Sequence, residues 1–334
     1  MLGAYETDEE PVFPVPPKET RNISPAGSVA AQGVCQTKGM EWTPGGVSND
    51  IEDRRDDSGG GGGGGFGFGH MGVGGLLIVG ILSLLFHRNL FTLFSSDPST
   101  SGYPSTTPQV ARAVPDSQQD RQEQREVEFV SFVLDDVQRN WSSVLPQAEN
   151  VPYRHAKMVL FRDSYPSGCG MAQEAIGPFY CPEDEKVYLD LGFLSELRSR
   201  FGAPGEFAQA YVIAHEIGHH VQKLLGIEPK VRNLEESRPQ LANRLSVRLE
   251  LQADCFAGVW GNSTEQRKIV DTSDVESALH AAAAVGDDRL QKMATGRVSP
   301  ETFTHGTSAQ RVGWFRRGFE SGKVSACNTF KEEQ

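Results

Sequence analysis

The segment Ala210–Gly226 limits the fold and chemistry of this chain more than any other stretch. It contains the pentapeptide HEIGH, in which His215 and His219 are four residues apart and Glu216 directly follows the first histidine. On an α-helix this spacing places both imidazoles on one face, one turn apart, so that both can bind one metal ion. Glu216 can then act as the general base of a hydrolase. The pattern therefore predicts a catalytic zinc site on a helix.

The rest of this helix is largely apolar, which indicates that the helix is buried. We expect Gly226 to end it as a C-cap. The alternative is a chance occurrence of the pattern on a core helix, with the histidines hydrogen-bonded to carbonyl groups. A buried helix that carries two histidines and a glutamate on one face favours zinc over this alternative.

A second stretch, Ser246–Trp260, carries Glu250 and Asp254 four residues apart on another apolar helix. Buried carboxylates are costly unless they meet a cation or strong hydrogen-bond donors. Glu250 as third ligand would leave a fourth zinc position open, which is the arrangement of catalytic sites. Asp254 could then accept a hydrogen bond from the remaining ring N–H of His215 and fix its tautomer.

Two alternatives remain for these carboxylates. Either could form a salt bridge with Arg244 or Arg248, although the arginines do not clearly share the carboxylate face of the helix. In the other alternative, Asp254 rather than Glu250 binds the metal.

A third stretch, Thr304–Gly322, has His305 before a pair of residues typical of an N-cap, Thr307 and Ser308. Arg311 lies six residues after the histidine. Both side chains could stabilise the oxyanion that forms during acyl transfer. The alternative is a capping histidine and a surface arginine.

Charge and composition describe the rest of the chain. The 334 residues carry a formal net charge of −12 at pH 7. This balance lacks the basic signature of nucleic-acid binding, so we expect no nucleic-acid partner. Residues 1–71 are rich in Gly, Pro, Asp and Glu and include the glycine run Gly59–Gly65. Such a segment buries too little apolar surface to offset its ordering entropy, and we expect it to be disordered.

Residues 72–94 join two apolar runs that His87 and Arg88 interrupt. As a helix the stretch measures about 34 Å, enough to cross a hydrocarbon core of ~30 Å. A buried core helix is the alternative, but disordered neighbours would leave it nothing to pack against. We therefore expect one transmembrane anchor, followed by a disordered linker at 95–124 and a catalytic domain at 125–334.

Four cysteines follow the expected anchor: Cys169, Cys181, Cys255 and Cys327. Their even number suggests two disulfides in an oxidising compartment. Cys169 and Cys181 flank a probable turn, and a Cys255–Cys327 bond would link the helix of the third ligand to the C-terminal helix. We expect these two pairs and an extracytoplasmic catalytic domain on a single-pass membrane protein. Four free thiols in the cytosol are the alternative.

Hydrophobic periodicity predicts the elements around these motifs. We expect an amphipathic helix from about Glu126, a short helix near Leu194–Phe201, and three short strands, Lys157–Phe161, Pro178–Cys181 and Lys186–Leu191. The polar PEDE sequence between the last two strands predicts a turn.

Together the motifs HEIGHHVQ, ELQADCFAGVW, GCGMAQEAIGPFYCPEDEKVYLDLGF and THGTSAQR resemble the bacterial YpfJ-type neutral zinc metallopeptidase family over about Trp42–Asn328. The wider zincin pattern of HExxH plus ExxxD implies that Glu250 binds the metal. It also implies that Asp254 supports the ligands without binding the metal itself. The HGTSAQR stretch is also similar to the His-x5-Arg element of CAAX prenyl proteases and HtpX-type proteases, which strengthens the roles expected for His305 and Arg311.

These observations predict an α+β, zincin-like metallopeptidase domain, mainly helical with a small sheet, on a single transmembrane helix. We expect Zn²⁺ on His215, His219 and Glu250, and a protein or peptide substrate. The competing hypothesis is a membrane-tethered binding module with a structural zinc. Glu216 argues against it, because a structural site needs no general base.

Overall fold

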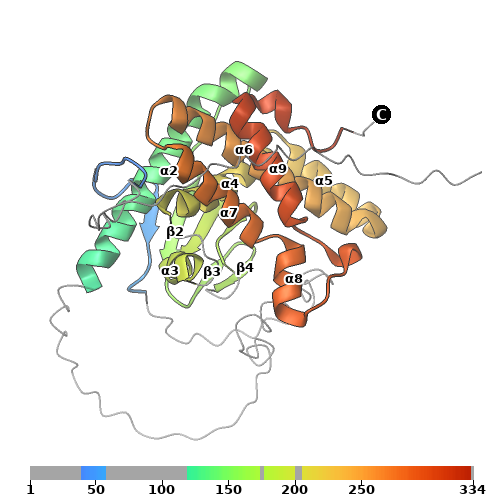
Figure 1. Cartoon of the computed structure of the whole chain (residues 1–334), viewed down its shortest axis with the longest axis horizontal. Helices are drawn as coiled ribbons and strands as arrows, with labels where there is room; N and C mark the ends of the chain where they lie inside the picture. The colour runs from blue at the N-terminus through green and yellow to red at the C-terminus, as the bar shows by residue number, and fades with distance from the viewer. Residues whose placement is uncertain (1–38, 58–118, 174–176, 200–204, 332–334) are drawn as a thin grey trace, which may run out of the picture. The chain divides into compact units, whose positions relative to one another are not determined.

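Helix α4 (Glu206–Leu224) forms where the HEIGH motif predicts a helix, and most of its residues are buried. The computed structural model describes residues 39–57, 119–173, 177–199 and 205–331, all within the unit Lys38–Gln334 (Figure 1). Gly226 adopts the left-handed conformation, with φ of 66°, directly after the last turn of α4. A residue without a Cβ atom fits this conformation, so the expected helix end is confirmed.

Around α4 the described residues form further helices. These are α2 (Gln119–Glu149), α3 (Leu191–Ser199), α5 (Ile227–Ser237), α6 (Ala242–Gln266), α7 (Thr272–Ala284), α8 (Asp287–Thr295) and α9 (Ser308–Ser321). Short 3₁₀ turns lie at Pro239–Leu241 (η3), Pro300–Thr302 (η4) and Val324–Cys327 (η5). The helices expected from periodicity are confirmed, and α5, α7 and α8 were not predicted.

A four-stranded sheet lies beside the helices in the order β1-β2-β6-β5. Its strands are β1 (Ile51–Asp53), β2 (Lys157–Phe161), β5 (Phe179–Cys181) and β6 (Lys186–Asp190). Strands β1, β2 and β6 run parallel, whereas β5 runs antiparallel to β6 and forms an edge of the sheet. The last four residues of both β2 and β6 are buried, as expected for strands covered on both faces. The three predicted strands are therefore confirmed, each to within one residue at its ends.

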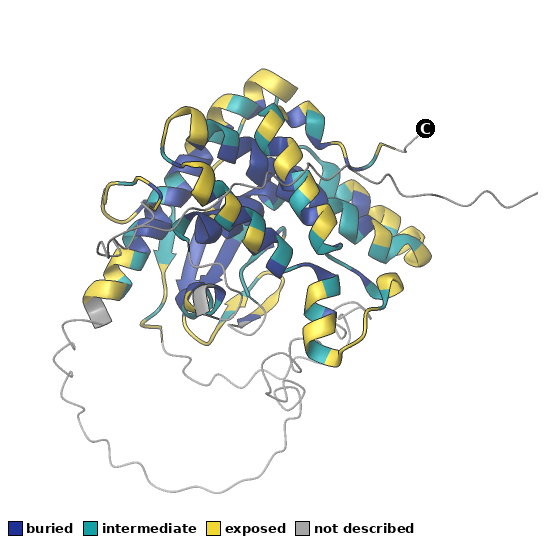
Figure 2. Ribbon diagram, in the orientation of Figure 1, coloured by how far each residue is buried: buried dark blue, intermediate teal, exposed yellow. Residues whose placement is uncertain are grey.

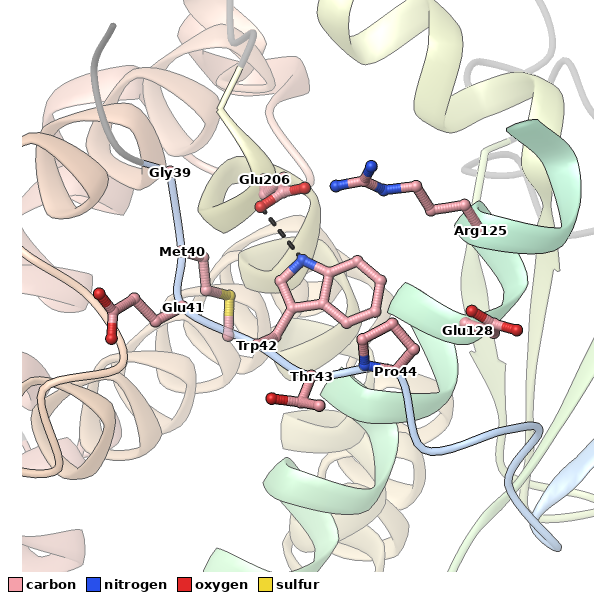
Figure 3. A pocket seen from close by; sticks show the side chains of 9 residues that line it. All are labelled: Gly39, Met40, Glu41, Trp42, Thr43, Pro44, Arg125, Glu128 and Glu206. Atoms are coloured by element: carbon pink, nitrogen blue, oxygen red, sulfur yellow. Dashed lines mark hydrogen bonds between the residues drawn. The ribbon is translucent and has the colours of Figure 1, made fainter. Parts of the chain in front are cut away.

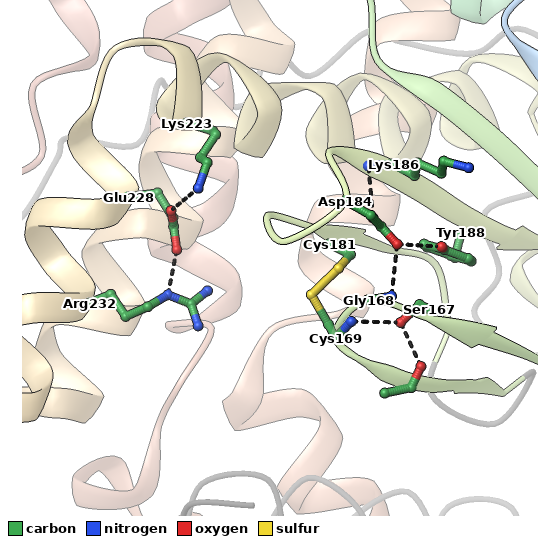
Figure 4. The surroundings of a disulfide bond; sticks show 11 residues. Ser167, Gly168, Cys169, Cys181, Asp184, Lys186, Tyr188, Lys223, Glu228 and Arg232 are labelled. Carbon is green, nitrogen blue, oxygen red and sulfur yellow. Dashed lines mark hydrogen bonds and ion pairs between the residues drawn. A yellow bond between two sulfur atoms is a disulfide. The ribbon is translucent and has the colours of Figure 1, made fainter. Parts of the chain in front are cut away.

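A separate hairpin joins β3 (Ser164–Ser167) to β4 (Gly170–Gln173), and Cys169 lies in its turn. A disulfide links Cys169 to Cys181 at the end of β5, with Cα atoms 5.7 Å apart (Figure 4). Asp184 supports the same turn, because its Oδ2 accepts hydrogen bonds from Gly168 N–H and the Tyr188 hydroxyl. The hairpin is thus fixed to the edge strand, and the first expected disulfide is confirmed.

Helices α6 and α9 pack closely enough that backbone touches backbone. A Cβ atom added at Gly318 would lie 1.9 Å from the carbonyl oxygen of Cys255. Near this contact the second expected disulfide, Cys255–Cys327, is confirmed and ties α6 to η5, with Cα atoms 5.5 Å apart. Thr307 is the N-cap of α9, as expected, and it forms a capping box with Gln310 that fixes the start of the helix.

The core lies where these helices meet one another and the sheet, as the dark blue residues of Figure 2 show. Its largest fully buried side chains include Trp141, Trp260, Tyr211, Phe207 and Phe256. The predicted α+β architecture, mainly helical with a small sheet, is therefore observed in the described residues.

The expectation of disorder through residue 71 is wrong for residues 39–57. Met40 is 4% exposed and belongs to the core, and Trp42 packs against Phe129 with ring centroids 5.3 Å apart. The indole N–H of Trp42 donates to Glu206 at 3.2 Å, beside a pocket that also contains Arg125 (Figure 3). These apolar side chains stand too far apart in the sequence to show a periodicity, yet they complete the core.

The expected membrane span at 72–94 lies outside the described residues, as do most of the linker at 95–124 and the N-terminal residues 1–38. Among the helices that the structure describes, none is both long and apolar enough to cross a membrane. Residues 119–124 of the expected linker belong to α2.

Replacing Gly318 by alanine tests the close contact between α6 and α9. Because the new Cβ atom would clash with Cys255 O, we expect Gly318→Ala to lower the free energy of unfolding by about 1–3 kcal/mol or more. Gly313 on the same helix has open space around its Cα, so Gly313→Ala should be neutral or stabilise by up to about 1 kcal/mol. Urea denaturation of both variants makes the comparison. Equal stabilities would contradict the described packing.

Candidate metal centre

Three side chains predicted as metal ligands lie together. Nε2 of His215 is 3.2 Å from one carboxylate oxygen of Glu250, and Nε2 of His219 is 3.5 Å from the other. One ligand atom from each residue lies within 4.8 Å of the other two. The structure therefore brings His215, His219 and Glu250 into one cluster.

The two distances are close to the spacing of ligand atoms around a tetrahedral zinc ion, and each ends at a different oxygen of Glu250. Ligand atoms about 2.0–2.2 Å from zinc at tetrahedral angles are about 3.3–3.6 Å from one another. Two imidazole nitrogens and one carboxylate oxygen are also a donor set that zinc prefers in catalytic sites. The side chains of His219 and Glu250 are 19% and 18% exposed, so solvent reaches the cluster. The residues present thus fit zinc with an open position.

Close contact between α4 and α6 produces this arrangement. Gly218 lies between the two histidines in the sequence. A Cβ atom added there would lie 3.0 Å from the carbonyl oxygen of Ala253 on α6. The glycine of HEIGH therefore lets α6 approach α4, so that Glu250 can reach both imidazoles. A larger residue would push the third ligand away from the first two.

Asp254 lies on the opposite side of His215 from Glu250. Its Oδ1 is 2.8 Å from Nδ1 of His215, and its side chain has no exposure. The Tyr211 hydroxyl donates to the same oxygen at 2.5 Å. This geometry agrees with Asp254 fixing the tautomer of His215 and leaves Glu250 as the carboxylate that faces both Nε2 atoms.

Arg311 lies behind His215, on the side of Asp254. Its Nε and one terminal nitrogen donate to the two carboxylate oxygens of Asp254 at 2.8 and 2.9 Å. The guanidinium also donates to the carbonyl of Val285 and the hydroxyl of Tyr211, and Arg311 is 4% exposed. Its position does not support the expected role in oxyanion binding. It favours a positioning role, in which Arg311 neutralises and orients Asp254.

His219 is oriented by amides instead of charges. Its Nδ1 is 2.9 Å from the carbonyl oxygen of the Gln222 side chain. The Gln222 amide donates to the side-chain oxygen of Gln252 at 3.1 Å, and Gln252 donates to the carbonyl of Cys327 at 2.9 Å. A chain of buried amides therefore connects the second ligand to the segment held by the Cys255–Cys327 disulfide.

Glu216 is 7% exposed and lies next to the ligand cluster. Burial raises the pKa of its carboxyl group to about 7, and the negative charge of Glu250 adds to this increase. The charge of His215 and a hydrogen bond from the backbone of Tyr180 oppose it. A pKa near neutrality suits a group that must both accept and return a proton.

His220 fixes the edge strand to α4 near Glu216. Its Nδ1 is 3.0 Å from the Tyr180 hydroxyl, and its Nε2 is 2.7 Å from the carbonyl oxygen of Arg154. Both ring nitrogens are thereby engaged away from the ligand cluster. This third histidine of the motif is a structural residue.

His305 is held by Asp287 at the start of α8. Nδ1 of His305 is 3.2 Å from Asp287 Oδ1, and the backbone N–H groups of Thr304 and His305 donate to Oδ2. Burial alone would lower the pKa of His305, but the hydrogen bond to Asp287 and the charge of Glu250 raise it. His305 therefore lies within electrostatic reach of the cluster, with its Nδ1 already engaged.

The charges of the cluster balance one another. Burial alone would lower the pKa of His215, but Asp254 and the hydrogen bond with Glu250 raise it to about 10. Burial likewise opposes ionisation of Asp254, yet Arg311 and His215 lower its pKa. Without a metal, the proton on His215 thus balances the negative charge of Asp254 and Glu250. A bound metal cation would balance the same carboxylates.

Three residues that the sequence reasoning missed belong to this site: Tyr211, Gln222 and Asp287. Tyr211 lies one helical turn before His215 and Gln222 three residues after His219, so helical spacing could have indicated both. Asp287 belongs to an unpredicted helix, and no sequence signal links it to His305.

We expect Arg311→Gln to weaken zinc binding about 10–100-fold, because His215 loses an oriented partner at Asp254. Arg316→Gln, on the exposed face of the same helix, should leave zinc affinity unchanged. Competition with a chelator measures the affinity, and circular dichroism checks the fold. If Arg311→Gln fails to fold, Arg311→Lys should fold and bind zinc with an intermediate affinity. Lysine keeps the positive charge but cannot form the paired hydrogen bonds of the guanidinium to both oxygens of Asp254. Wild-type zinc affinity in a folded Arg311→Gln protein would contradict the positioning role.

Zinc binding should release a proton from His215. The metal-free imidazole has a pKa of about 10 and is protonated at pH 8, whereas a ligand imidazole must be neutral. We expect Asp254→Asn to release fewer protons per zinc than wild type, because its His215 loses the charge that raises the pKa. Calorimetry in buffers of different ionisation enthalpy counts the protons. Equal release from both proteins would show that Asp254 does not control this titration.

Comparison with known sequences agrees with this geometry. The chain matches the model of a family described as "Putative neutral zinc metallopeptidase" over residues 40–330. It is 47% identical over 295 residues to "Uncharacterized protein YpfJ" of Escherichia coli strain K12, covering 87% of this chain and 99% of that protein. It is 44% identical over 201 residues to "Uncharacterized protein Mb2605" of Mycobacterium bovis, covering 57% of this chain and 66% of that protein. No solved structure matches the chain.

The family match includes β1, the HEIGH helix, the helix of Glu250 and the segment of His305. It therefore extends over all the elements that form the candidate metal centre. The resemblance inferred from the motifs is confirmed, and the chain belongs to the neutral zinc metallopeptidase family.

Proposed function

We propose that this chain is a zinc-dependent peptidase that hydrolyses peptide bonds with His215, His219 and Glu250 as metal ligands. The observation that carries the proposal is the position of Glu216, a buried carboxyl group beside the cluster of three candidate ligands. A purely structural zinc site closes its fourth position and needs no such group. Bound zinc would supply a Lewis acid that activates water and polarises the substrate carbonyl.

The protein groups around this centre have separate tasks. Glu216 takes the proton of the attacking water and gives it to the leaving amine, for which a pKa near 7 is suitable. Asp287 holds Nδ1 of His305. Burial alone would lower the pKa of this histidine, but Asp287 raises it, which favours the imidazolium form. Nε2–H of that form can donate a hydrogen bond to the oxyanion. Asp254 and Arg311 keep His215 in one orientation during these steps.

The edge strand β5 supports a peptide as substrate. Tyr180 lies in the middle of β5, and its backbone forms a hydrogen bond with Glu216. Among the described strands, β5 has β6 on one side and no sheet partner on the other. An extended peptide could pair with this edge and place its scissile bond beside Glu216.

We further propose that the catalytic domain is extracytoplasmic. Two disulfides support this location, since such bonds persist in oxidising compartments and are rare in reducing ones. The bond between Cys169 and Cys181 also holds the β3–β4 hairpin against β5, the proposed substrate strand. An oxidising environment would therefore be needed for a rigid substrate edge.

Replacing Glu216 by glutamine tests the proposed chemistry. Glu216→Gln should keep the fold and bind one zinc ion per chain, but it should lose peptide hydrolysis by about 10²–10⁴-fold because the water loses its base. Glu265→Gln, on the exposed end of α6, serves as the matched control and should retain activity. Activity is measured on a broad peptide library by mass spectrometry.

Two outcomes would contradict the proposal. Equal cleavage by wild type and Glu216→Gln would exclude Glu216 as general base. Zinc binding without cleavage of any peptide by the wild type would instead favour a binding module that keeps a structural zinc.

A further inference from the structure

The segment 39–57 pairs with strands that follow residue 118, although the apolar stretch 72–94 lies between them in the sequence. Strand β1 runs parallel to β2, from Ile51 opposite Met158 to Asp53 opposite Leu160. Backbone hydrogen bonds extend this pairing at both ends, and each is 2.8 Å long. They join Met158 N–H to Asp50 O and Arg54 N–H to Leu160 O.

Charged side chains reinforce the same junction. Asp50 forms ion pairs with Lys157 at 2.8 Å and with His155 at 2.6 Å, and it accepts a hydrogen bond from Gln138 at 2.9 Å. Burial alone would raise the pKa of Asp50, but Lys157 and His155 lower it. The segment 39–57 and strand β2 are therefore joined by side-chain contacts as well as by the backbone hydrogen bonds of paired strands.

The start of the segment is equally integrated. Met40 is 4% exposed within the core, and the N–H of Glu41 donates to the carbonyl of Ile269 at 2.7 Å. Trp42 packs against Phe129 on α2 and donates to Glu206 at the start of α4 (Figure 3). Burying side chains of this size contributes about 1.5–3 kcal/mol each, so the domain has lower stability without this segment.

Such pairing restricts the path of the chain relative to a membrane. Paired strands lie about 5 Å apart, whereas a hydrocarbon core is about 30 Å thick. Residues 39–57 and 119–331 must therefore occupy the same side of any membrane. A single crossing between Asp57 and Gln119 would put them on opposite sides and would remove β1 from the sheet.

We infer that residues 39–57 and the catalytic domain lie on one side of the membrane, so that the chain makes no single crossing between Asp57 and Gln119. Two helical crossings would require about 40 apolar residues, and the stretch 72–94 suffices for only one. This inference replaces the expected single-pass anchor with attachment from one side. It rests on β1, Met40 and Trp42 and does not depend on the metal centre.

Site-directed labelling of the full-length protein tests the inference. In a Cys35→Ser background, which leaves only the disulfide-bonded cysteines, Val47→Cys and Arg139→Cys are made separately. Val47 is 49% exposed, and the side chain of Arg139 on α2 is 72% exposed, so neither substitution disturbs the core. A membrane-impermeant maleimide is added to intact cells, to inverted membrane vesicles and to detergent-solubilised samples of each.

We expect both cysteines to react from the same side and to be protected from the other, with full reaction of both in detergent. Reaction of Val47→Cys from one side and Arg139→Cys only from the other would overturn the inference. If both react only in inverted vesicles, the inference stands, and the proposed extracytoplasmic location fails. If the protein is recovered without membranes, it also makes no crossing, and the proposal of membrane attachment fails instead.

Discussion

The charge pairing of Asp254 is the interaction on which the candidate site depends. A carboxylate without solvent exposure is stable only when its charge is balanced, and here Arg311 and His215 balance it from two directions. Each partner comes from a different helix, so the ion cluster fixes α4, α6 and α9 relative to one another. Removing one member would leave a buried charge without compensation. Helices α4 and α6 also supply the candidate metal ligands, and His305 lies just before α9, so the geometry of the candidate site and core stability have a common origin.

The family and the cluster of three candidate ligands could be predicted from the sequence because they depend on local spacing. His215 and His219 share a helix face by geometry, and so do Glu250 and Asp254. The direction of Arg311 could not be predicted in this way. Its position six residues after His305 suggested a shared task, but the backbone contact between Gly318 and Cys255 turns α9 so that Arg311 faces Asp254. That contact joins residues more than sixty positions apart, and spacing within one motif contains no information about it.

The strength of the local sequence pattern decided which strands could be predicted. Strands β2 and β6 have buried runs of four residues, so their patterns are strong, and the pairing of Cys169 with Cys181 follows from the turn that they flank. Strand β1 has only three residues, and Glu52 and Asp53 give it the composition of a disordered segment. It is ordered because β2 offers an unpaired edge and because Lys186 pairs with Glu52 at 2.8 Å. Contacts with distant parts of the chain therefore stabilise β1, and the composition of the segment alone gives the wrong prediction.

The two histidine ligands are oriented by partners of different chemistry. Asp254, which holds His215, is a carboxylate that acid can protonate, whereas the amides of Gln222 and Gln252 that hold His219 do not titrate. Acid can therefore remove the support of His215 by protonating Asp254, whereas the amide support of His219 contains no titrating group. Although burial opposes the change, Arg311 and His215 lower the pKa of Asp254, so its carboxylate keeps His215 oriented below the pH at which an ordinary aspartate is protonated.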